Sequence, residues 1–179
     1  MPSSCARTSA QVLPGQPPHP GPAARSVSLR PLAAGDPAEV DELIRHWHGT
    51  SVDNHWYNDL QQGHTPAQAR AFFRTEVMGR CRVQVAVVDG RLAGLIALQP
   101  PWTQQLAVFA EYRRHGVGGV LLAWARGVSP AGLRLFTFQR NQAARAFYKR
   151  HGFAVQCLGT SPAPENEPDV EYAWSARQP

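Results

Sequence analysis

The chain contains a glycine-rich turn that links a short apolar strand to a helix. A helix start exposes unpaired backbone N–H groups and the positive end of the macrodipole, so it binds anions when side chains leave the approach open. Gly116, Gly118 and Gly119 leave that approach open, and Arg113 and Arg114 can donate charge-assisted hydrogen bonds to phosphates. The turn therefore predicts a phosphate site. Glycines that serve only backbone geometry or packing are the alternative.

Two common kinds of nucleotide site are disfavoured by the residues around the turn. No Gly-Lys-Ser or Gly-Lys-Thr follows the glycines, so the lysine and hydroxyl with which nucleotide triphosphatases hold phosphate and magnesium are missing. The Gly-x-Gly-x-x-Gly spacing of dinucleotide folds is also missing. An ATPase or a dehydrogenase is therefore disfavoured.

Two segments together resemble a known family. The strand Leu106-Ala107-Val108-Phe109 followed by Arg113-x-x-Gly116-x-Gly118 resembles the acetyl-CoA motif of the GNAT superfamily of N-acetyltransferases. Residues 141–153 resemble that superfamily's second common segment, Asn-x-x-Ala-x-x-Phe-Tyr-x-x-x-Gly-Phe. Both stand in the family's order and at its usual separation, and the resemblance spans residues 28–175.

The resemblance implies a binding site for acetyl-CoA as co-substrate, with no metal. In the family, the strand bulges away from its neighbour, which leaves backbone N–H groups for the thioester oxygen and pantetheine; periodicity alone places the strand only in a sheet. Asn141 would hold pantetheine or a bridging water, or would simply cap a helix. The implied coenzyme-binding residues are Leu106, Ala107, Val108, Arg113, Arg114, His115, Gly116, Val117, Gly118, Gly119, Asn141, Ala144 and Phe147.

The resemblance also implies direct acetyl transfer to a primary amine. Tyr148 matches the family's general-acid position, from which a hydroxyl can protonate the leaving thiolate; a core tyrosine packed on Phe147 is the alternative. Family members often place a Glu just before the central strand, where this chain has Gln104 and Gln105. This departure leaves the general base open. The other candidates are a water chain and Asp53, His55, His64, Asp169 and Glu171.

Three further groups of residues have two interpretations each. Residues 46–59, rich in His and aromatic side chains, predict a substrate-reading loop, or else core and lid packing; a metal site is disfavoured there. Glu111 is interpreted as a structural partner of the phosphate arginines. The acids between Glu165 and Glu171 would attract a cationic amine, or would form a solvated loop.

Composition limits the class of protein. A chain of 179 residues with 43% hydrophobic content fits one domain with a real core. Cys5, Cys81 and Cys157 are too scattered for a disulfide framework or a zinc site, which favours a cytoplasmic protein. No apolar run predicts a membrane span or a signal peptide.

The net charge of +5 would allow nucleic-acid binding. Many basic residues, however, lie between residues 113 and 150 around the two motifs, where they suit a phosphate-rich ligand. Neither a zinc-finger spacing nor an aromatic RNA-binding motif is found, so a nucleic-acid partner is disfavoured. The expected partners are acetyl-CoA and an amine-bearing small molecule or peptide, for a monomer or homodimer. A catalytically weak acyl-CoA sensor is the alternative function.

Residues 1–26 are rich in Pro, Ser, Gly and Ala and predict a disordered tail, and residues 27–179 predict the N-acetyltransferase domain. We expect capping boxes at Asp36 and Thr65, a buried stripe of Ala69, Phe72, Phe73 and Val77, and an inner face of Val117, Val120, Leu121 and Trp124. The expected strands are 27–30, 82–88, 91–98, 105–109, 133–138, 153–158 and 170–174. The order strand, two helices, three strands, helix, strand, helix, two strands predicts an α/β fold, a mixed sheet with helices on both faces.

Overall fold

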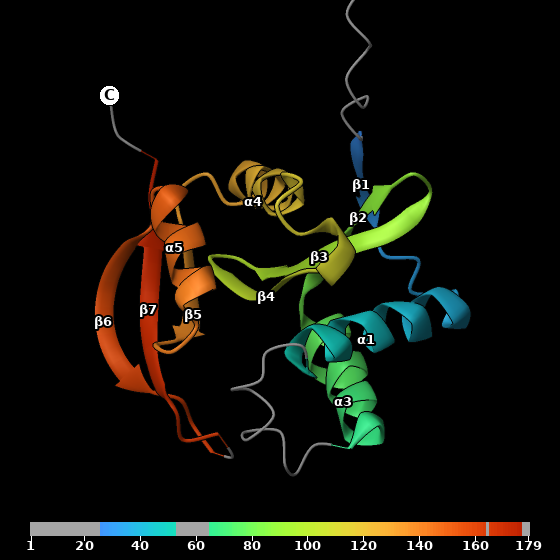
Figure 1. Cartoon of the computed structure of the whole chain (residues 1–179), viewed down its shortest axis with the longest axis horizontal. Coiled ribbons are helices and arrows are strands. Elements are labelled where there is room, and N and C mark those ends of the chain that lie inside the picture. The colour runs from blue at the N-terminus through green and yellow to red at the C-terminus, as the bar shows by residue number, and fades with distance from the viewer. Residues whose placement is uncertain (1–25, 53–64, 164, 177–179) are drawn as a thin grey trace, which may run out of the picture.

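The computed structural model describes residues 26–52, 65–163 and 165–176, so nearly all of the predicted tail lies outside the described residues. Its seven-stranded sheet has the order β1-β2-β3-β4-β5-β7-β6 (Figure 1). Among the described strands, only β4 and β5 pair in parallel. The strands are β1 (Val27–Pro31), β2 (Arg82–Val88), β3 (Arg91–Gln99), β4 (Trp102–Val108), β5 (Leu133–Phe138), β6 (Ala154–Thr160) and β7 (Pro168–Trp174).

The helices stand in the predicted order, which confirms the mixed α/β fold. They are α1 (Pro37–Val52), α3 (Pro66–Phe72), the π-helical η1 (Phe73–Met78), the 3-10 turn η2 (Ala110–Tyr112), α4 (Val117–Val128) and α5 (Gln142–Arg150). Within the described ranges, none of them combines the length and the apolar character needed to cross a bilayer.

The centre of the sheet is the meander of β2, β3 and β4. Asp89 and Gly90 have positive φ angles of 50° and 77°, as a two-residue hairpin turn requires, and this turn was predicted. The start of β4 was predicted too late, at residue 105. Trp102 follows the prolines directly, yet it already pairs with Gln99 of β3 and Arg134 of β5.

The start of α1 differs from its predicted capping box. Asp36 caps the helix, because its carboxylate accepts hydrogen bonds from the N–H groups of Ala38 (3.0 Å) and Glu39 (3.3 Å). The Glu39 side chain does not accept a hydrogen bond from the N–H of Asp36, as a capping box requires; that N–H donates to the carbonyl of Ala33. Its carboxylate accepts from Ala33 N–H (3.0 Å) and from the Arg30 guanidinium (2.6 Å), and the Arg30 hydrogen bond lowers the pKa of Glu39. Glu39 therefore joins β1 to α1.

The start of α3 has the predicted capping box. The Thr65 hydroxyl accepts from Gln68 N–H (3.2 Å), and the Gln68 side chain accepts from Thr65 N–H (2.8 Å). The predicted buried stripe is correct for Ala69, Phe73 and Val77. It is wrong for Phe72, which is 46% exposed because it lies at the margin of the helix pair and stacks one ring face on Trp47.

Thr65→Ala is expected to lower the free energy of unfolding by about 1 kcal/mol, because it leaves a helix N–H group without its acceptor. Urea denaturation measures this change. Thr75→Ala is the matched control, since the Thr75 hydroxyl only donates to the carbonyl of Ala71 within the same helical segment. Equal losses in the two variants would contradict a capping role for Thr65.

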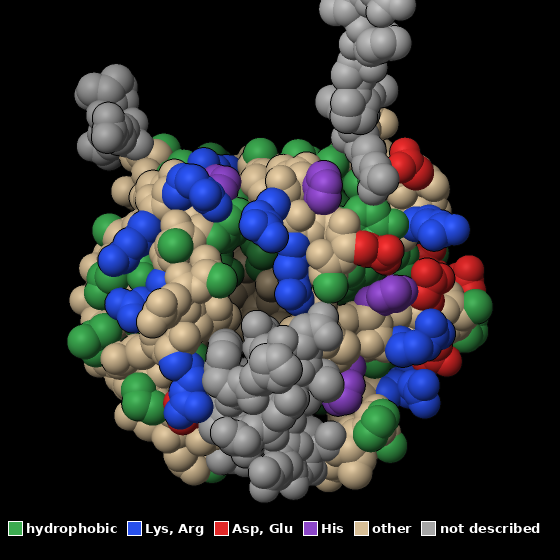
Figure 2. Space-filling view, in the orientation of Figure 1, with side chains coloured by type: hydrophobic (Ala, Val, Ile, Leu, Met, Phe, Trp, Pro, Cys, Tyr) green, Lys and Arg blue, Asp and Glu red, His purple; other side chains and the backbone are tan. Residues whose placement is uncertain are grey.

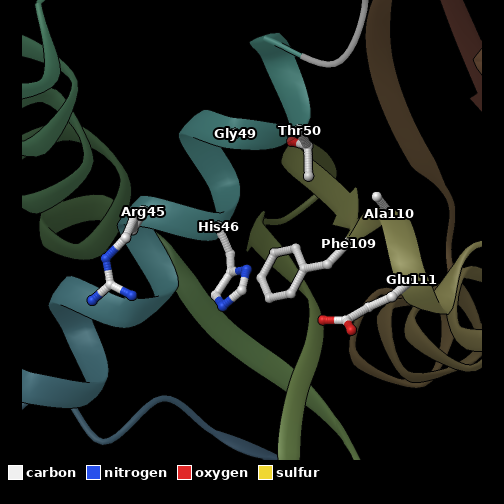
Figure 3. Close-up of a pocket in the computed structure, with 7 residues that line it drawn as sticks. All are labelled: Arg45, His46, Gly49, Thr50, Phe109, Ala110 and Glu111. Atoms are coloured by element: carbon white, nitrogen blue, oxygen red, sulfur yellow. The ribbon is translucent and has the colours of Figure 1, made fainter.

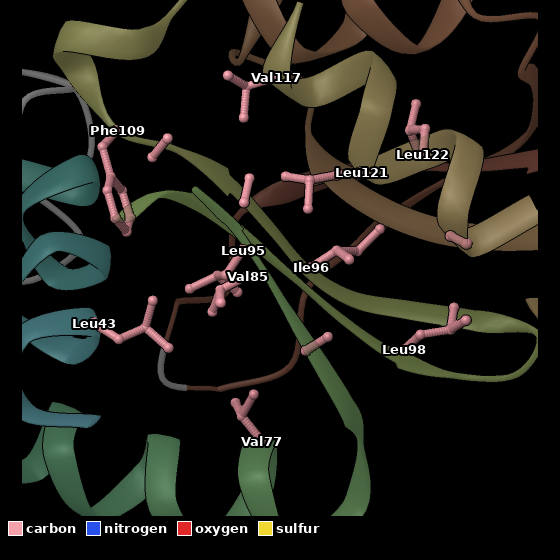
Figure 4. Close-up of a cluster of buried hydrophobic side chains, with 14 of the residues drawn as sticks. Leu43, Val77, Val85, Leu95, Ile96, Leu98, Phe109, Val117, Leu121 and Leu122 are labelled. Atoms are coloured by element: carbon pink, nitrogen blue, oxygen red, sulfur yellow. The ribbon is translucent and has the colours of Figure 1, made fainter. Parts of the chain in front are cut away.

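Helices cover both faces of the sheet. Val117, Leu121 and Leu122 of α4 lie on one side of β3 and β4, and Leu43 of α1 and Val77 of η1 lie on the other (Figure 4). The predicted inner face of α4 is only partly correct. Val120 and Trp124 are half-buried, whereas Leu122 and Ala125 are fully buried. The helix is thus buried over a wider arc than a single stripe.

The helix α5 packs on the second half of the sheet. The Tyr148 ring lies 6.0 Å from the Tyr172 ring of β7 and 5.6 Å from the Phe153 ring, measured between centroids. Arg126 of α4 donates to the carbonyl of His151 at the end of α5, and its guanidinium lies 4.5 Å from the Trp174 ring centroid. Arg126 therefore fixes α4, α5 and β7 relative to one another.

Candidate functional site

A wedge opens between the parallel strands β4 and β5. Their backbones pair only at Trp102 and Arg134, and beyond that point the two strands diverge (Figure 1). Phe109 N–H donates to Ala93 O of β3 (3.0 Å). Because successive N–H groups of a strand point to opposite edges, the N–H of Val108 points away from β3, toward the wedge. The wedge thus exposes backbone donors inside a sheet.

The glycine-rich turn places the N-terminus of α4 beside this wedge. Arg114 and Gly116 have positive φ angles of 65° and 82°, and Gly116 is the N-cap residue. No described side chain caps α4, so its first N–H groups have the character of an anion site. The chain therefore combines a left-handed bend with an uncapped helix start.

The next two glycines allow α4 and α5 to approach closely. A Cβ atom on Gly118 would lie 2.9 Å from Cζ of Phe147, and one on Gly119 would lie 3.3 Å from Nε2 of His151. These glycines have the packing role that was the alternative interpretation, and they also line the cavity described next.

The wedge, the turn and α5 enclose a cavity of about 810 Å³. All of the predicted coenzyme-binding residues except His115 line it, and so does Tyr148; His115 is exposed. Three further residues line the cavity that the sequence reasoning missed, Ala143, Arg150 and His151. Thr50, from the segment predicted to read the substrate, lines it as well. Ala143, Arg150 and His151 stand at helical spacing from Phe147, a signal that could have found them. Thr50 reaches the cavity from the last turns of α1.

The cavity is positively charged. Arg113, Arg114, Arg150 and His151 are among the described lining residues, and none of these lining residues is an Asp or a Glu. Figure 2 shows Lys and Arg side chains along the rim of a hollow on this face. A cleft lined by positively charged side chains attracts an anionic ligand.

Tyr148 packs in the core and also borders the cavity. Its ring packs in the core against Phe153 and Tyr172, and it is only 7% exposed, yet it lines the cavity. Burial raises the pKa of the Tyr148 hydroxyl well above its ordinary value, so the phenol is protonated at neutral pH. Its O–H can therefore act as a proton donor.

Asn141 caps a helix, as one of its two interpretations predicted, and its role toward pantetheine stays a prediction. Its side-chain oxygen accepts from Ala144 N–H (3.0 Å), which caps α5, and the residue lines the cavity. The carboxylates that were candidate bases are placed differently. Asp169 and Glu171 are buried in β7, where Glu171 pairs with Arg134, and neither is among the described cavity-lining residues.

Residues 46–52 belong to the last turns of α1 rather than to a loop, which corrects the prediction; Asp53, His55, His64, Trp56 and Tyr57 lie outside the described residues. Trp47 has a packing role. Its ring lies 5.0 Å from the Phe73 ring centroid, and its Nε1–H donates to Gln105 (3.1 Å). The Gln105 side chain therefore helps to hold α1 on the sheet.

Glu111 is not among the described residues that line the large cavity with Arg113 and Arg114. It lines a second, smaller cavity of about 240 Å³ with Arg45 and His46. Figure 3 shows His46 against the Phe109 ring, with Glu111 beyond it; the two ring centroids are 4.8 Å apart. Thr50 lines both cavities, so they adjoin at α1.

A family model agrees with this arrangement of elements. Residues 79–155, from the end of η1 into β6, match the model of the acetyltransferase (GNAT) domain. In this segment the chain matches the GNAT superfamily. Both sequence motifs fall within the matched GNAT residues.

Solved structures share the GNAT fold. YjaB from Escherichia coli is 24% identical, with a TM-score of 0.67 over 84% of this chain and 99% of YjaB. A GCN5-related N-acetyltransferase from Rhodopseudomonas palustris is 21% identical, with a TM-score of 0.67 over 87% of this chain and all of its own. The PaiA N-acetyltransferase from Thermoplasma acidophilum, solved with coenzyme A, is 16% identical, with a TM-score of 0.57 over 83% and 99% of the two chains.

Proposed function

We propose that this protein transfers an acetyl group from acetyl-CoA directly to a primary amine of a small molecule or peptide. One observation carries the proposal: a single cavity contains the wedge of β4, the uncapped start of α4, and Asn141 and Tyr148 of α5. The structure of PaiA with coenzyme A, which shares the fold, supports the choice of ligand.

In this proposal the coenzyme spans the cavity. Its diphosphate binds the first N–H groups of α4 beside Arg114, where the dipole and the arginine both favour an anion. Its pantetheine arm enters the wedge and bonds to the free edge of β4. The N–H of Val108 then donates to the thioester carbonyl oxygen.

The chemistry follows from that placement. The amine nitrogen attacks the thioester carbon, and the Val108 N–H stabilises the negative charge that develops on the oxygen. When the C–S bond breaks, the Tyr148 hydroxyl gives its proton to the leaving thiolate. The attacking nitrogen gives up its extra proton to water, and a proton from solvent restores the Tyr148 phenol. The products are an acetamide and coenzyme A.

The amine must lose a proton before it attacks, because alkyl ammonium groups have pKa values of about 10. Neither Asp169 nor Glu171 is among the described lining residues of the cavity, and Gln105 is not basic. We assign this step to a water chain that connects the cavity with solvent, one of the candidates that the sequence leaves open. The rate should rise with pH as the free amine becomes more abundant.

Incubation with acetyl-CoA and a panel of primary amines tests the proposal. We expect release of free thiol together with a product 42 mass units heavier than the amine, roughly the mass of an acetyl group replacing hydrogen. Reactions without an amine control for thioester hydrolysis. Binding of acetyl-CoA without turnover on any amine would favour the sensor function, and the absence of binding heat would overturn the proposal.

A further inference from the structure

We propose that β6 pairs edge to edge, in antiparallel orientation, with β6 of a second copy of this chain, so that the protein forms a two-fold dimer. β6 lies at one end of the sheet and, among the described strands, pairs only with β7 (Figure 1). All seven of its residues are exposed, and none is among the described residues that line the coenzyme cavity. Within the described chain, its outer edge therefore presents a row of unpaired backbone N–H and C=O groups.

The two edge strands of the sheet differ in how they are protected against pairing with another chain. Edge strands are usually protected by short length, charged side chains or proline. The edge strand β1 has only five residues, and it ends with Arg30 and Pro31. β6 is seven residues long, and its sequence, Ala-Val-Gln-Cys-Leu-Gly-Thr, contains neither a charged residue nor a proline. The chain thus protects one edge of its sheet and leaves the other open to pairing.

Two large apolar side chains lie along this open edge. Leu158 is 65% exposed and Val155 is 43% exposed. Their partners in β7 are Val170 and Tyr172, two residues apart, so both side chains lie on the face of the sheet that α5 covers farther inward. The bulge between Val155 and Cys157 brings two residues three positions apart onto this one face. A second copy along the edge adds its own Val155 and Leu158, and all four side chains become buried.

The charges beside the two ends of β6 favour an antiparallel partner of the same sequence. Lys149 and Arg150, the last residues of α5, precede the strand; both are exposed, and neither makes an ion pair within the described part of the chain. Glu165 follows the strand, and Asp169 pairs with Gly159 near its end. Antiparallel pairing places the cationic end of each copy next to the acidic end of the other, whereas parallel pairing would place like charges together. The two-fold axis makes this match twice.

Sedimentation equilibrium of the full chain over a range of concentrations tests the proposal. We expect the mass to rise from one chain to two between about 1 and 100 µM, because one pair of edge strands buries less area than a standard stable interface. Leu158→Lys should raise the dissociation constant at least about tenfold, because it places like charges in the paired edge. Ser28→Lys, which adds the same charge at an exposed position of the edge strand β1, should leave the constant unchanged.

Cys157 provides a second test, because it is exposed and lies near the middle of β6. Pairing about a two-fold axis near this point brings the two copies of Cys157 together. A short bis-maleimide should then join them in the wild-type protein but not in Leu158→Lys, and peptide mass spectrometry identifies the joined residues. Three results would overturn the proposal: a single chain up to about 100 µM, a dimer that Leu158→Lys does not weaken, or cross-links between other cysteines alone. None of these results bears on acetyl transfer, which is tested separately.

Discussion

Tyr148→Phe is expected to lower kcat for acetyl transfer about 100-fold or more, the usual contribution of a positioned acid. The ring keeps its packing on Phe153 and Tyr172, so the melting temperature and the affinity for coenzyme A should stay close to the wild-type values. Because burial raises the pKa of Tyr148, its proton stays bound as the pH rises, and the wild-type rate should not fall near pH 10, about where ordinary tyrosines ionise.

Tyr172→Phe is the matched control. The Tyr172 hydroxyl is buried without a hydrogen-bond partner among the described residues, and its ring neighbours that of Tyr148, but Tyr172 is not among the described cavity-lining residues. This variant should keep its activity and lose no stability, because the removed hydroxyl leaves no partner unsatisfied. Full activity in Tyr148→Phe, or an equal loss in the control, would remove Tyr148 from the mechanism.

Gly94→Ala is expected to lower the free energy of unfolding by about 1–3 kcal/mol, the usual cost of forcing an extra carbon into a packed site. A Cβ atom there would lie 2.5 Å from the carbonyl oxygen of Ala107, and a backbone atom cannot rotate away as a side chain does. Gly94 pairs with Val108 across β3 and β4, so the shift should also weaken coenzyme A binding. Urea denaturation and calorimetry measure the two effects.

Gly127→Ala provides the opposite expectation for the same chemical change. Gly127 lies in α4, and a Cβ atom there would meet no atom within 4 Å. The variant should be as stable as the wild type or more stable by up to about 1 kcal/mol, because Ala favours the helix. A loss in both variants would show that the close approach at Gly94 is not the cause.

Local patterns predicted the elements well where one motif decides the conformation. The Thr65 and Gln68 pair and the Asp89-Gly90 turn each carry their hydrogen bonds or dihedral angles within a few residues, and both were predicted. Glu39 was predicted less well because a distant residue, Arg30, and the N–H of Ala33 compete for its carboxylate. The cap therefore depends on tertiary structure that no local spacing contains.

The candidate site likewise has features that local sequence predicts and features that depend on tertiary structure. The motif residues could be placed on strand, turn and helix from the sequence, but the role of Gly118 against Phe147 depends on how closely two helices pack. Thr50 reaches the cavity from α1, far away in the sequence. Likewise, Phe72 fits a helical stripe but lies at its margin, because the crossing of α1 and α3 decides which face is covered.

The single backbone bridge between Trp102 and Arg134 has a consequence for the empty protein. The two halves of the sheet, β1-β2-β3-β4 and β5-β7-β6, are joined by this one backbone pairing. Along the rest of the boundary between β4 and β5, no further backbone pairing of the described strands resists their separation. A ligand that binds between β4 and β5 takes the place of a strand and holds the two halves of the sheet together. Without ligand, the protein should therefore open locally between β4 and β5. In hydrogen exchange, the amide protons of β5 that face β4 should exchange well before those in the interior of β3.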